Sequence, residues 1–231
     1  LKDLIRNLIL KPFKLDEDAM LRADLINLSV NENILVFTIH HIASDAWSVP
    51  IFIREVVELY NAHSQGRQAV LPALQVQYAD YSIWQRNYIE GDVLNKKLSY
   101  WKTKLDGVDP LDLPTDYVRP AIRGTNGEIA YFRLEKELSI KLNEFSQKNE
   151  MSLYMTLLAA YDVLLSKYSG QQDIAVGASI ANRPQQELDG LIGYFVNTLT
   201  LRNSVQSNST FIDLLDQVKA TTLEAYEHQD V

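Results

Sequence analysis

An apolar run leads into two adjacent histidines and an aspartate at residues 34–48, which read Ile34-Leu35-Val36-Phe37-Thr38-Ile39-His40-His41-Ile42-Ala43-Ser44-Asp45-Ala46-Trp47-Ser48. Residues 34–39 are rich in β-branched and aromatic types, which predicts a buried strand. His40 and His41 follow directly, before a turn, and the chain has only four histidines. A histidine at the mouth of a buried strand suits a catalytic base better than a solvated loop does.

The sequence on either side predicts a hairpin and a helix. Residues 21–28 alternate apolar with polar side chains, and a turn at residues 31–33 would pair them antiparallel with residues 34–39. Ser48 is predicted to be the N-cap of a helix that continues to about His63.

The rest of the chain predicts a mixture of helices and scattered strands. Aromatic and amphipathic patterns indicate helices at 78–89, 93–105, 139–149, 152–170 and 210–226, and strands at 129–134, 173–181 and 195–201. Three prolines without periodicity make residues 108–126 the best domain boundary. We therefore predict an α/β or α+β protein of two lobes, at 1–122 and 123–231.

Composition excludes several classes of function. The net charge of −8 disfavours non-specific binding to nucleic acid or to an anionic membrane. The absence of cysteine excludes disulfides, thiol nucleophiles and cysteine–zinc sites. No apolar run approaches membrane-spanning length and no signal peptide opens the chain, so a cytoplasmic protein is expected. Because the chain begins and stops at helix-like patterns without a start methionine, we expect it to be a piece of a longer protein.

Three kinds of chemistry compete for the histidine pair. A metal site is disfavoured because successive strand residues point to opposite faces, so His40 and His41 cannot easily reach one ion. A serine mechanism has weak support because neither Ser44 nor Ser48 lies in a Gly-x-Ser-x-Gly elbow, and a phosphate-binding glycine loop is absent. Two interpretations remain. In the first, a single histidine acts as a base. In the second, the histidine belongs to the core and Asp45 only marks the start of a helix.

Several further segments share a family pattern with the His40-His41-x-x-x-Asp45 motif. They are Tyr78-Ala79-Asp80-Tyr81-Ser82-Ile83-Trp84-Gln85-Arg86, Leu113-Pro114-Thr115-Asp116, Asp173 to Arg183, Ile192-Gly193-Tyr194-Phe195-Val196-Asn197-Thr198-Leu199 and the terminal His228-Gln229-Asp230-Val231. In this order they resemble the motifs of the condensation domains of nonribosomal peptide synthetases. The resemblance covers the middle of such a domain.

The resemblance implies a fold and a function. The family fold has two chloramphenicol-acetyltransferase-like lobes, both incomplete in this chain. Upstream and downstream peptidyl carrier domains, beside an adenylation domain, deliver acyl groups as phosphopantetheine thioesters, and the downstream amine attacks the upstream thioester to form a peptide bond. No cofactor bound by the domain itself, no metal, and no nucleic-acid or membrane partner is implied, and the products are secondary metabolites such as antibiotics.

The resemblance also assigns roles to individual residues. It implies that His41 is the catalytic histidine, as base or amine-positioning residue, with His40 packing behind it. It implies that Asp45 forms an ion pair with Arg183. Substrate-channel candidates are Ala46, Trp47, Ser48 and Asn197. The family usually has glycine where Ala46 stands, so the sequence raises the question of a strained backbone there.

The alternatives within the family differ in chemistry. Trp47-Ser48 is typical of condensation rather than epimerization domains, and heterocyclisation domains replace the histidines with aspartates. A non-catalytic relative that binds carrier or tailoring proteins tends to lose the histidines, which this chain keeps. A free-standing acyltransferase that uses soluble thioesters is the third alternative.

Overall fold

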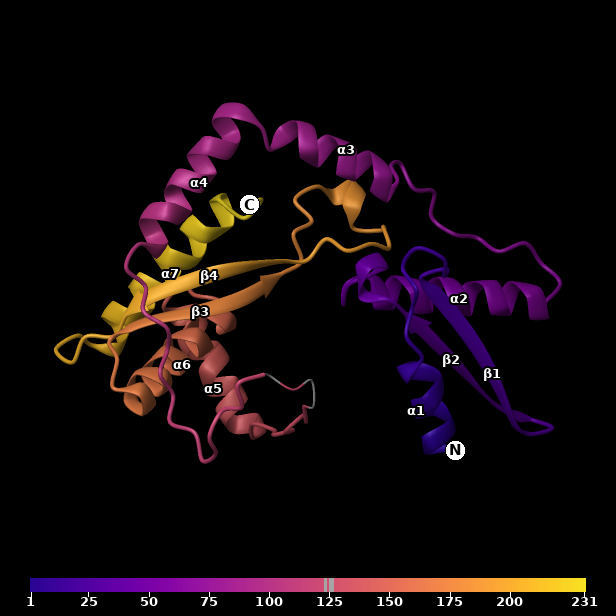
Figure 1. Ribbon diagram of the computed structural model, residues 1–231, viewed down its shortest axis with the longest axis horizontal. Coiled ribbons are helices and arrows are strands. Elements are labelled where there is room, and N and C mark those ends of the chain that lie inside the picture. The colour runs from indigo at the N-terminus through magenta and orange to yellow at the C-terminus, as the bar shows by residue number, and fades with distance from the viewer. Residues whose placement is uncertain (123, 125–126) are drawn as a thin grey trace. The chain divides into compact units, whose positions relative to one another are not determined.

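The computed structural model describes residues 1–122, 124 and 127–231, and these form two compact units (Figure 1). Unit 1 contains Leu1–Glu90 and Ile180–Asn197, and unit 2 contains Gly91–Ser179 and Thr198–Val231. The segment 180–197 thus belongs with the first unit although it is distant in sequence. The predicted lobes at 1–122 and 123–231 stay a prediction, and residues 123, 125 and 126 of the predicted boundary lie outside the described residues.

Unit 1 is built from a hairpin and helices. Its elements are α1 Lys2–Leu10, β1 Leu21–Ser29, β2 Glu32–Ile39, the short 3-10 helix η1 His41–Ala43, α2 Ser48–Ser64, α3 Tyr78–Tyr88 and the 3-10 helix η2 Gln186–Leu188. The predicted antiparallel hairpin is confirmed, with Leu25 opposite Leu35 and a bulge between Asn27 and Ser29. The turn lies at residues 30 and 31, slightly earlier than predicted.

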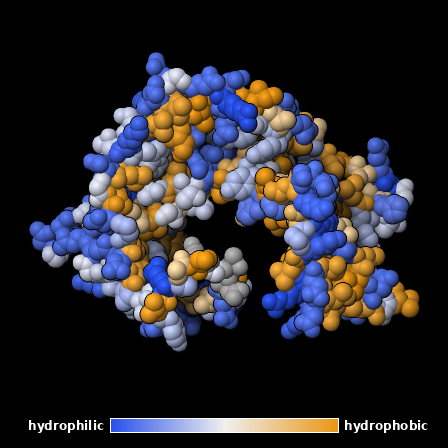
Figure 2. Space-filling model, in the orientation of Figure 1, coloured by the Kyte–Doolittle hydropathy of each residue, from blue (hydrophilic) through white to orange (hydrophobic). Residues whose placement is uncertain are grey.

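The burial of β2 is less complete than its sequence suggests. The ring of Phe37 contacts that of Phe52 on α2 at 4.8 Å between centroids. Val36 on the opposite face is buried, but Leu35, on the same face as Phe37, is exposed. Figure 2 shows apolar surface over the part of unit 1 that contains α1 and the hairpin. The expectation of a buried strand therefore holds only in part: along β2 Val36 is buried and residues 34 and 37–39 are half-buried, whereas Leu35 is exposed.

Segment 180–197 is fixed to unit 1 by an apolar cluster. Tyr81 of α3 packs with Leu188, Leu191 and Phe195, and all four side chains are buried. Burying large apolar side chains stabilises such a junction by roughly 1.5–3 kcal/mol each. The cluster therefore carries residues from the second half of the sequence to the histidine motif in the first.

Unit 2 combines helices with a two-stranded sheet of β3 and β4. Its elements are α4 Gly91–Leu105, α5 Lys136–Lys148, α6 Leu153–Ser169, β3 Asp173–Ile180, β4 Asn197–Ser204 and α7 Phe211–Glu227. Two predicted caps are confirmed: Ser152 accepts a hydrogen bond from the N–H of Met155, and Thr210 forms a capping box with Asp213. No described helix is long and apolar enough to cross a membrane.

One predicted strand is wrong. Residues 129–134 have no regular secondary structure, and Ile129, Tyr131 and Phe132 are 70%, 89% and 87% exposed. A strand needs a partner edge for its N–H and C=O groups, and none of the described strands pairs with this segment.

The end of α7 docks on α4. The ring of His228 stacks on Tyr100 at 3.9 Å, the indole N–H of Trp101 donates to the carbonyl of His228 at 2.9 Å, and Lys97 forms an ion pair with Asp230. The terminal motif thus has a structural role in unit 2.

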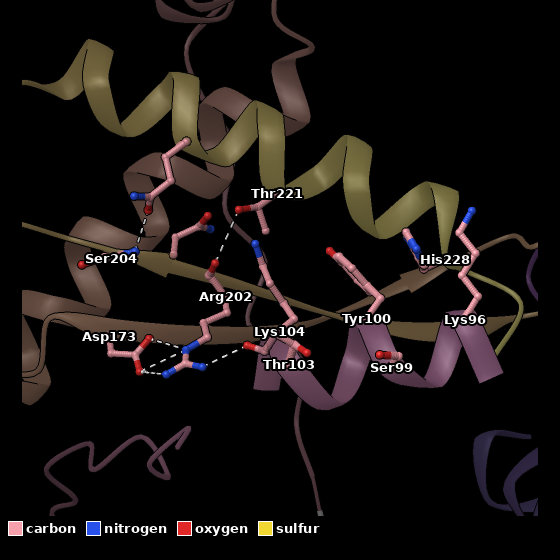
Figure 3. Close-up of a pocket in the computed structure, with 12 residues that line it drawn as sticks. Lys96, Ser99, Tyr100, Thr103, Lys104, Asp173, Arg202, Ser204, Thr221 and His228 are labelled. Carbon is pink, nitrogen blue, oxygen red and sulfur yellow. Dashed lines mark hydrogen bonds and ion pairs between the residues drawn. The ribbon is translucent and has the colours of Figure 1, made fainter. Parts of the chain in front are cut away.

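A cavity of about 920 Å³ lies beside this contact and is lined by residues of α4, β3, β4 and α7 (Figure 3). Its strongest charges have partners within the protein. Arg202 binds Asp173 at 2.7 Å and the carbonyls of Lys104 and Asp106, and Lys104 pairs with Glu224. The lining therefore ties α4 to the sheet and to α7.

A buried carboxyl group lies in the core of unit 2. Asp162 of α6 is fully buried and accepts a hydrogen bond at 2.8 Å from the amide N–H of Asn203, also buried. Oδ1 of Asp162 and Oδ1 of Asn203 have no hydrogen-bond partner. Burial raises the pKa of Asp162 to about 6, although the Asn203 hydrogen bond opposes this. A proton on Asp162 would supply the donor that these two acceptors lack.

We expect the stability of this core to fall as pH rises and the Asp162→Asn variant to remove that dependence. The raised pKa of Asp162, about 6 against its usual 3.8, gives stability that is complete at low pH and is lost as pH rises through 6. Between pH 4 and pH 8 the loss is roughly 2–3 kcal/mol. Hydrogen exchange of α6 peptides in the full-length protein measures it as the free energy of local opening. Parallel pH curves for the natural chain and the variant would contradict the assignment.

Candidate active site

The two histidines separate at the end of β2. His40 has extended backbone, and its Nδ1 accepts a hydrogen bond from the N–H of Ile42 at 3.1 Å, which caps η1. Its ring meets the edge of Phe13 at 5.5 Å. His40 therefore has the packing role that the sequence predicted.

His41 lies on the first residue of η1 with an exposed side chain. Its Nδ1 lies 2.7 Å from the carbonyl oxygen of Ser44. A carbonyl oxygen only accepts hydrogen bonds, so Nδ1 carries the hydrogen, and in the neutral ring the lone pair is at Nε2. The imidazole thus presents a basic nitrogen away from its own loop.

The ion pair predicted between Asp45 and Arg183 is confirmed. Their side chains are 3% and 2% exposed, and the nearest nitrogen and oxygen atoms lie 3.3 Å apart. Arg183 also donates to the carbonyls of Leu188 and Leu191, the latter at 3.0 Å, and its guanidinium lies 3.8 Å from the centre of the Phe195 ring. Both partners are within unit 1.

Asp45 is an anchor for two loops. It accepts hydrogen bonds from the backbone N–H and hydroxyl of Ser48 at 2.9 and 2.7 Å and from the N–H of Phe195 at 3.1 Å. Burial raises its pKa, but the hydrogen bonds from Ser48 and Phe195 and the charge of Arg183 outweigh burial, so the pKa of Asp45 is lowered overall. An ionised carboxylate with its oxygens occupied holds the loop and does not transfer protons.

Ser48 differs from its predicted roles. It is the first residue of α2, with Trp47 at the N-cap position, and Asp45 supplies the side-chain hydrogen bond at this helix start. Ser48 is 1% exposed. Its hydroxyl lies 3.0 Å from the carbonyl oxygen of Gly193 and accepts from the Gly193 N–H at 3.1 Å. This burial does not fit a substrate channel, and Ser48 instead joins the histidine loop to segment 180–197.

The other channel candidates lie nearer the surface. Trp47 is 47% exposed, and its indole N–H donates to the carbonyl of Asp189 at 3.1 Å. Ala46 is exposed in the turn before α2, and Asn197 is half-buried at the start of β4. Their place in a substrate channel stays a prediction.

The backbone at Ala46 is not strained. Positive φ among the described non-glycine residues occurs at Glu150 and Asn182, so Ala46 adopts an ordinary backbone conformation. The concern that alanine is strained in the position of the family's glycine is therefore wrong.

We expect Ala46→Gly to bring no gain in rate. Glycine relieves no strain here and adds flexibility to the unfolded chain, so it should destabilise the loop by about 0.5–1 kcal/mol. Reaction rate and hydrogen exchange of the loop in the full-length protein measure both effects. A rate above that of the natural chain would show that space, rather than strain, limits the reaction at Ala46.

The described residues contain no group of three or more His, Cys, Asp or Glu side chains that could hold a metal ion. His40 faces Phe13, whereas His41 faces Ser44 and Tyr194. The divergence of the two imidazoles follows from the change from strand to 3-10 helix between them.

Sequence reasoning missed three residues near His41. The ring of Tyr194 meets that of His41 at 5.4 Å with an interplanar angle of 74°. The hydroxyl of Tyr78 donates to the carbonyl of Tyr194 at 2.7 Å. A Cβ on Gly193 would lie 2.3 Å from the Tyr78 ring. The Gly-aromatic pair within the motif at 192–199 was the available signal.

Comparisons with known proteins agree with one family. The sequence profile of the condensation domain matches residues 1–231. A linear gramicidin synthase protein of Brevibacillus parabrevis is 47% identical over 95% of this chain, and chondramide synthase cmdD of Chondromyces crocatus is 42% identical over 96%. The chain spans 4% and 6% of the lengths of these two relatives.

Solved structures show the same fold. The X-domain from teicoplanin biosynthesis is 29% identical, with a TM-score of 0.89, and the chain covers 53% of it. A four-domain nonribosomal peptide synthetase is 26% identical, with a TM-score of 0.82 and 17% of that chain covered. The first condensation domain of the CDA synthetase, at 18% identity and a TM-score of 0.80, supports the fold alone. These neighbours confirm the predicted chloramphenicol-acetyltransferase-like α/β class, and with the match over its whole length this chain belongs to the condensation domain family.

Proposed function

We propose that this chain is part of an acyltransferase that forms peptide bonds between carrier-bound thioesters, with His41 as the base. The observation that carries the proposal is the hydrogen bond from Nδ1 of His41 to the carbonyl of Ser44 at 2.7 Å. It fixes the tautomer that leaves Nε2 free to accept a proton. The anchored Asp45 and Arg183 hold the loop that presents this nitrogen.

The chemistry needs a proton acceptor at this place. An α-amine is largely protonated near neutral pH and must lose a proton to attack. Once this proton is lost to solvent, the neutral amine attacks, and Nε2 of His41 accepts a second proton from the nitrogen as the new C–N bond forms at the thioester carbonyl. The tetrahedral intermediate then collapses, the C–S bond breaks, and the leaving thiolate takes the proton from His41 to become the thiol.

The proposed partners follow from the family. Upstream and downstream peptidyl carrier domains would each present a phosphopantetheine thioester, and an adenylation domain would charge the carrier. Similarity to gramicidin, chondramide and plipastatin synthases supports a product made by nonribosomal peptide synthesis. The expected cytoplasmic location stays a prediction.

The test is aminoacyl transfer between two loaded carrier domains in the full-length protein, with and without the His41→Ala substitution. We expect the product thioester to disappear in the variant while the carriers stay loaded. Transfer at the natural rate would refute the assignment of His41.

A second candidate function is a docking platform for another protein. The observation that favours it is the TM-score of 0.89 to the teicoplanin X-domain over the whole chain, together with a matched structure of that domain in complex with OxyB. A docking platform would not need the open Nε2 of His41. It would therefore be supported if His41→Ala left the final product unchanged while the full-length protein still captured a partner enzyme.

A further inference from the structure

The side chain of Tyr194 covers one side of the His41 ring. The centroids lie 5.4 Å apart at an interplanar angle of 74°, the edge-to-face geometry that aromatic rings prefer. The other side of the histidine is held by Ser44 through Nδ1. His41 is exposed on a single 3-10 turn, so without these two contacts its imidazole would be free to rotate.

Tyr194 itself is held by hydrogen bonds at three consecutive residues. Gly193 bonds to the Ser48 hydroxyl through its N–H, the carbonyl of Tyr194 accepts from Tyr78, and the N–H of Phe195 donates to Asp45. All three bonds use the backbone of segment 193–195. The position of the ring is thus set independently of its own hydroxyl group.

The close approach at Gly193 makes this arrangement possible. A Cβ there would lie 2.3 and 2.7 Å from two carbons of the Tyr78 ring, too near for any other residue without movement. Glycine therefore lets Tyr78 reach the carbonyl of Tyr194. The backbone of segment 193–195 therefore places the ring of Tyr194 against that of His41.

We propose that Tyr194 is a positioning residue for His41: its ring restricts the imidazole to the rotamer in which Nδ1 reaches Ser44 and Nε2 faces the substrate. The proposal rests on the proposed function of His41 as the base. Tyr194 does not exchange protons in this role, so its hydroxyl group is dispensable and its ring is not.

The experiment compares Tyr194→Leu with Tyr194→Phe in the full-length protein. Diethyl pyrocarbonate modifies unprotonated histidine nitrogens, and peptide mass spectrometry gives the modification rate of each histidine separately. We expect Tyr194→Leu to raise the modification rate of His41 about threefold or more and to lower kcat roughly 3- to 10-fold. This fold-change corresponds to the free energy of one aromatic–aromatic contact. The KM for the acceptor thioester should not change, and Tyr194→Phe should restore both readouts.

Internal controls separate positioning from general damage. His40, His63 and His228 should keep their modification rates, and Tyr168→Leu, at a tyrosine of unit 2 that is 65% exposed, should change neither readout. Tyr194 is 43% exposed and its loop is held through backbone atoms, so folding should survive. Tyr194→Met provides a second variant without a ring.

The outcomes distinguish this proposal from the proposed function. If His41→Ala abolishes transfer while Tyr194→Leu and Tyr194→Met leave kcat and His41 modification unchanged, Tyr194 has no positioning role. If His41→Ala keeps the natural rate, the proposed function fails and the labelling result alone decides whether Tyr194 holds His41. A loss of rate in Tyr194→Phe equal to that in Tyr194→Leu would overturn the proposal, because the hydroxyl group would then be the part that matters.

Discussion

Replacing His41 by alanine is expected to lower the rate of peptide-bond formation by roughly 10²–10⁴-fold, the usual contribution of a general base. The reason is the open Nε2, whose availability is fixed by the Nδ1 hydrogen bond to Ser44. The side chain is exposed, so its loss should cost little stability. Single-turnover transfer between loaded carriers measures the chemical step directly.

His40→Ala is the matched control for this prediction. His40 caps η1 and contacts Phe13, so its loss should cost about 1 kcal/mol of loop stability and much less in rate. Equal losses of rate in the two variants would mean that the motif is needed for structure alone.

Breaking the ion pair between Asp45 and Arg183 is expected to destabilise unit 1 by roughly 3–5 kcal/mol, because each single change leaves a buried charge without its partner. Arg183→Gln leaves Asp45 buried and removes the donor to the Leu188 and Leu191 carbonyls. Asp45→Asn places an amide N–H₂ among the donors of Ser48 and Phe195. The loss of stability should appear as a lower soluble yield and as faster hydrogen exchange in the loops at 41–48 and 183–195. These changes should be larger than any change in the reaction rate.

The double variant tests whether the two residues act as a pair. Asp45→Asn combined with Arg183→Gln should cost little more than either single change, because neither charge is then left alone. Additive losses would mean that each residue acts through its other partners.

Acid should weaken the same junction. The pKa of Asp45 in the folded protein lies below its usual 3.8, so its stabilising contribution is present above pH 3.8 and is lost as pH falls through the lower folded value. This dependence is opposite in sign to that of Asp162, whose carboxyl group destabilises the core of unit 2 when ionised at higher pH.

Local signals in the sequence predicted most of the regular elements. Alternation at residues 21–28 and the apolar run at 34–39 predicted the hairpin, and Ser152 and Thr210 predicted helix starts, because each of these signals acts within a few residues. The family motifs predicted the pairing of Asp45 with Arg183, which spacing alone could not connect across 138 residues.

Other features depended on contacts between distant segments. The apolar pattern at residues 129–134 predicted a strand, but a strand forms only where another edge accepts its hydrogen bonds. Ser48 looked like a helix cap and a channel residue, whereas its hydroxyl bonds Gly193, 145 residues away. Asp162 lies in a largely apolar helix, and no local pattern predicts its hydrogen-bond partner, Asn203, which lies on a strand 41 residues later.

The sequence by itself determined the family, the hairpin and the capped helices, and it predicted His41 as the catalytic histidine, because motifs and local hydrogen bonds involve residues close together in the chain. The local turn at Ser44 fixes which nitrogen of His41 is open, whereas tertiary structure alone decided which aromatic ring covers it and how Asp45 and Ser48 hold segment 180–197. These features depend on the packing of Tyr81, Leu188, Leu191 and Phe195, which brings residues more than 100 positions apart into contact. Hydrogen bonds and the Arg183 charge then lower the pKa of Asp45, and burial raises that of Asp162; both surroundings exist only once the chain has folded.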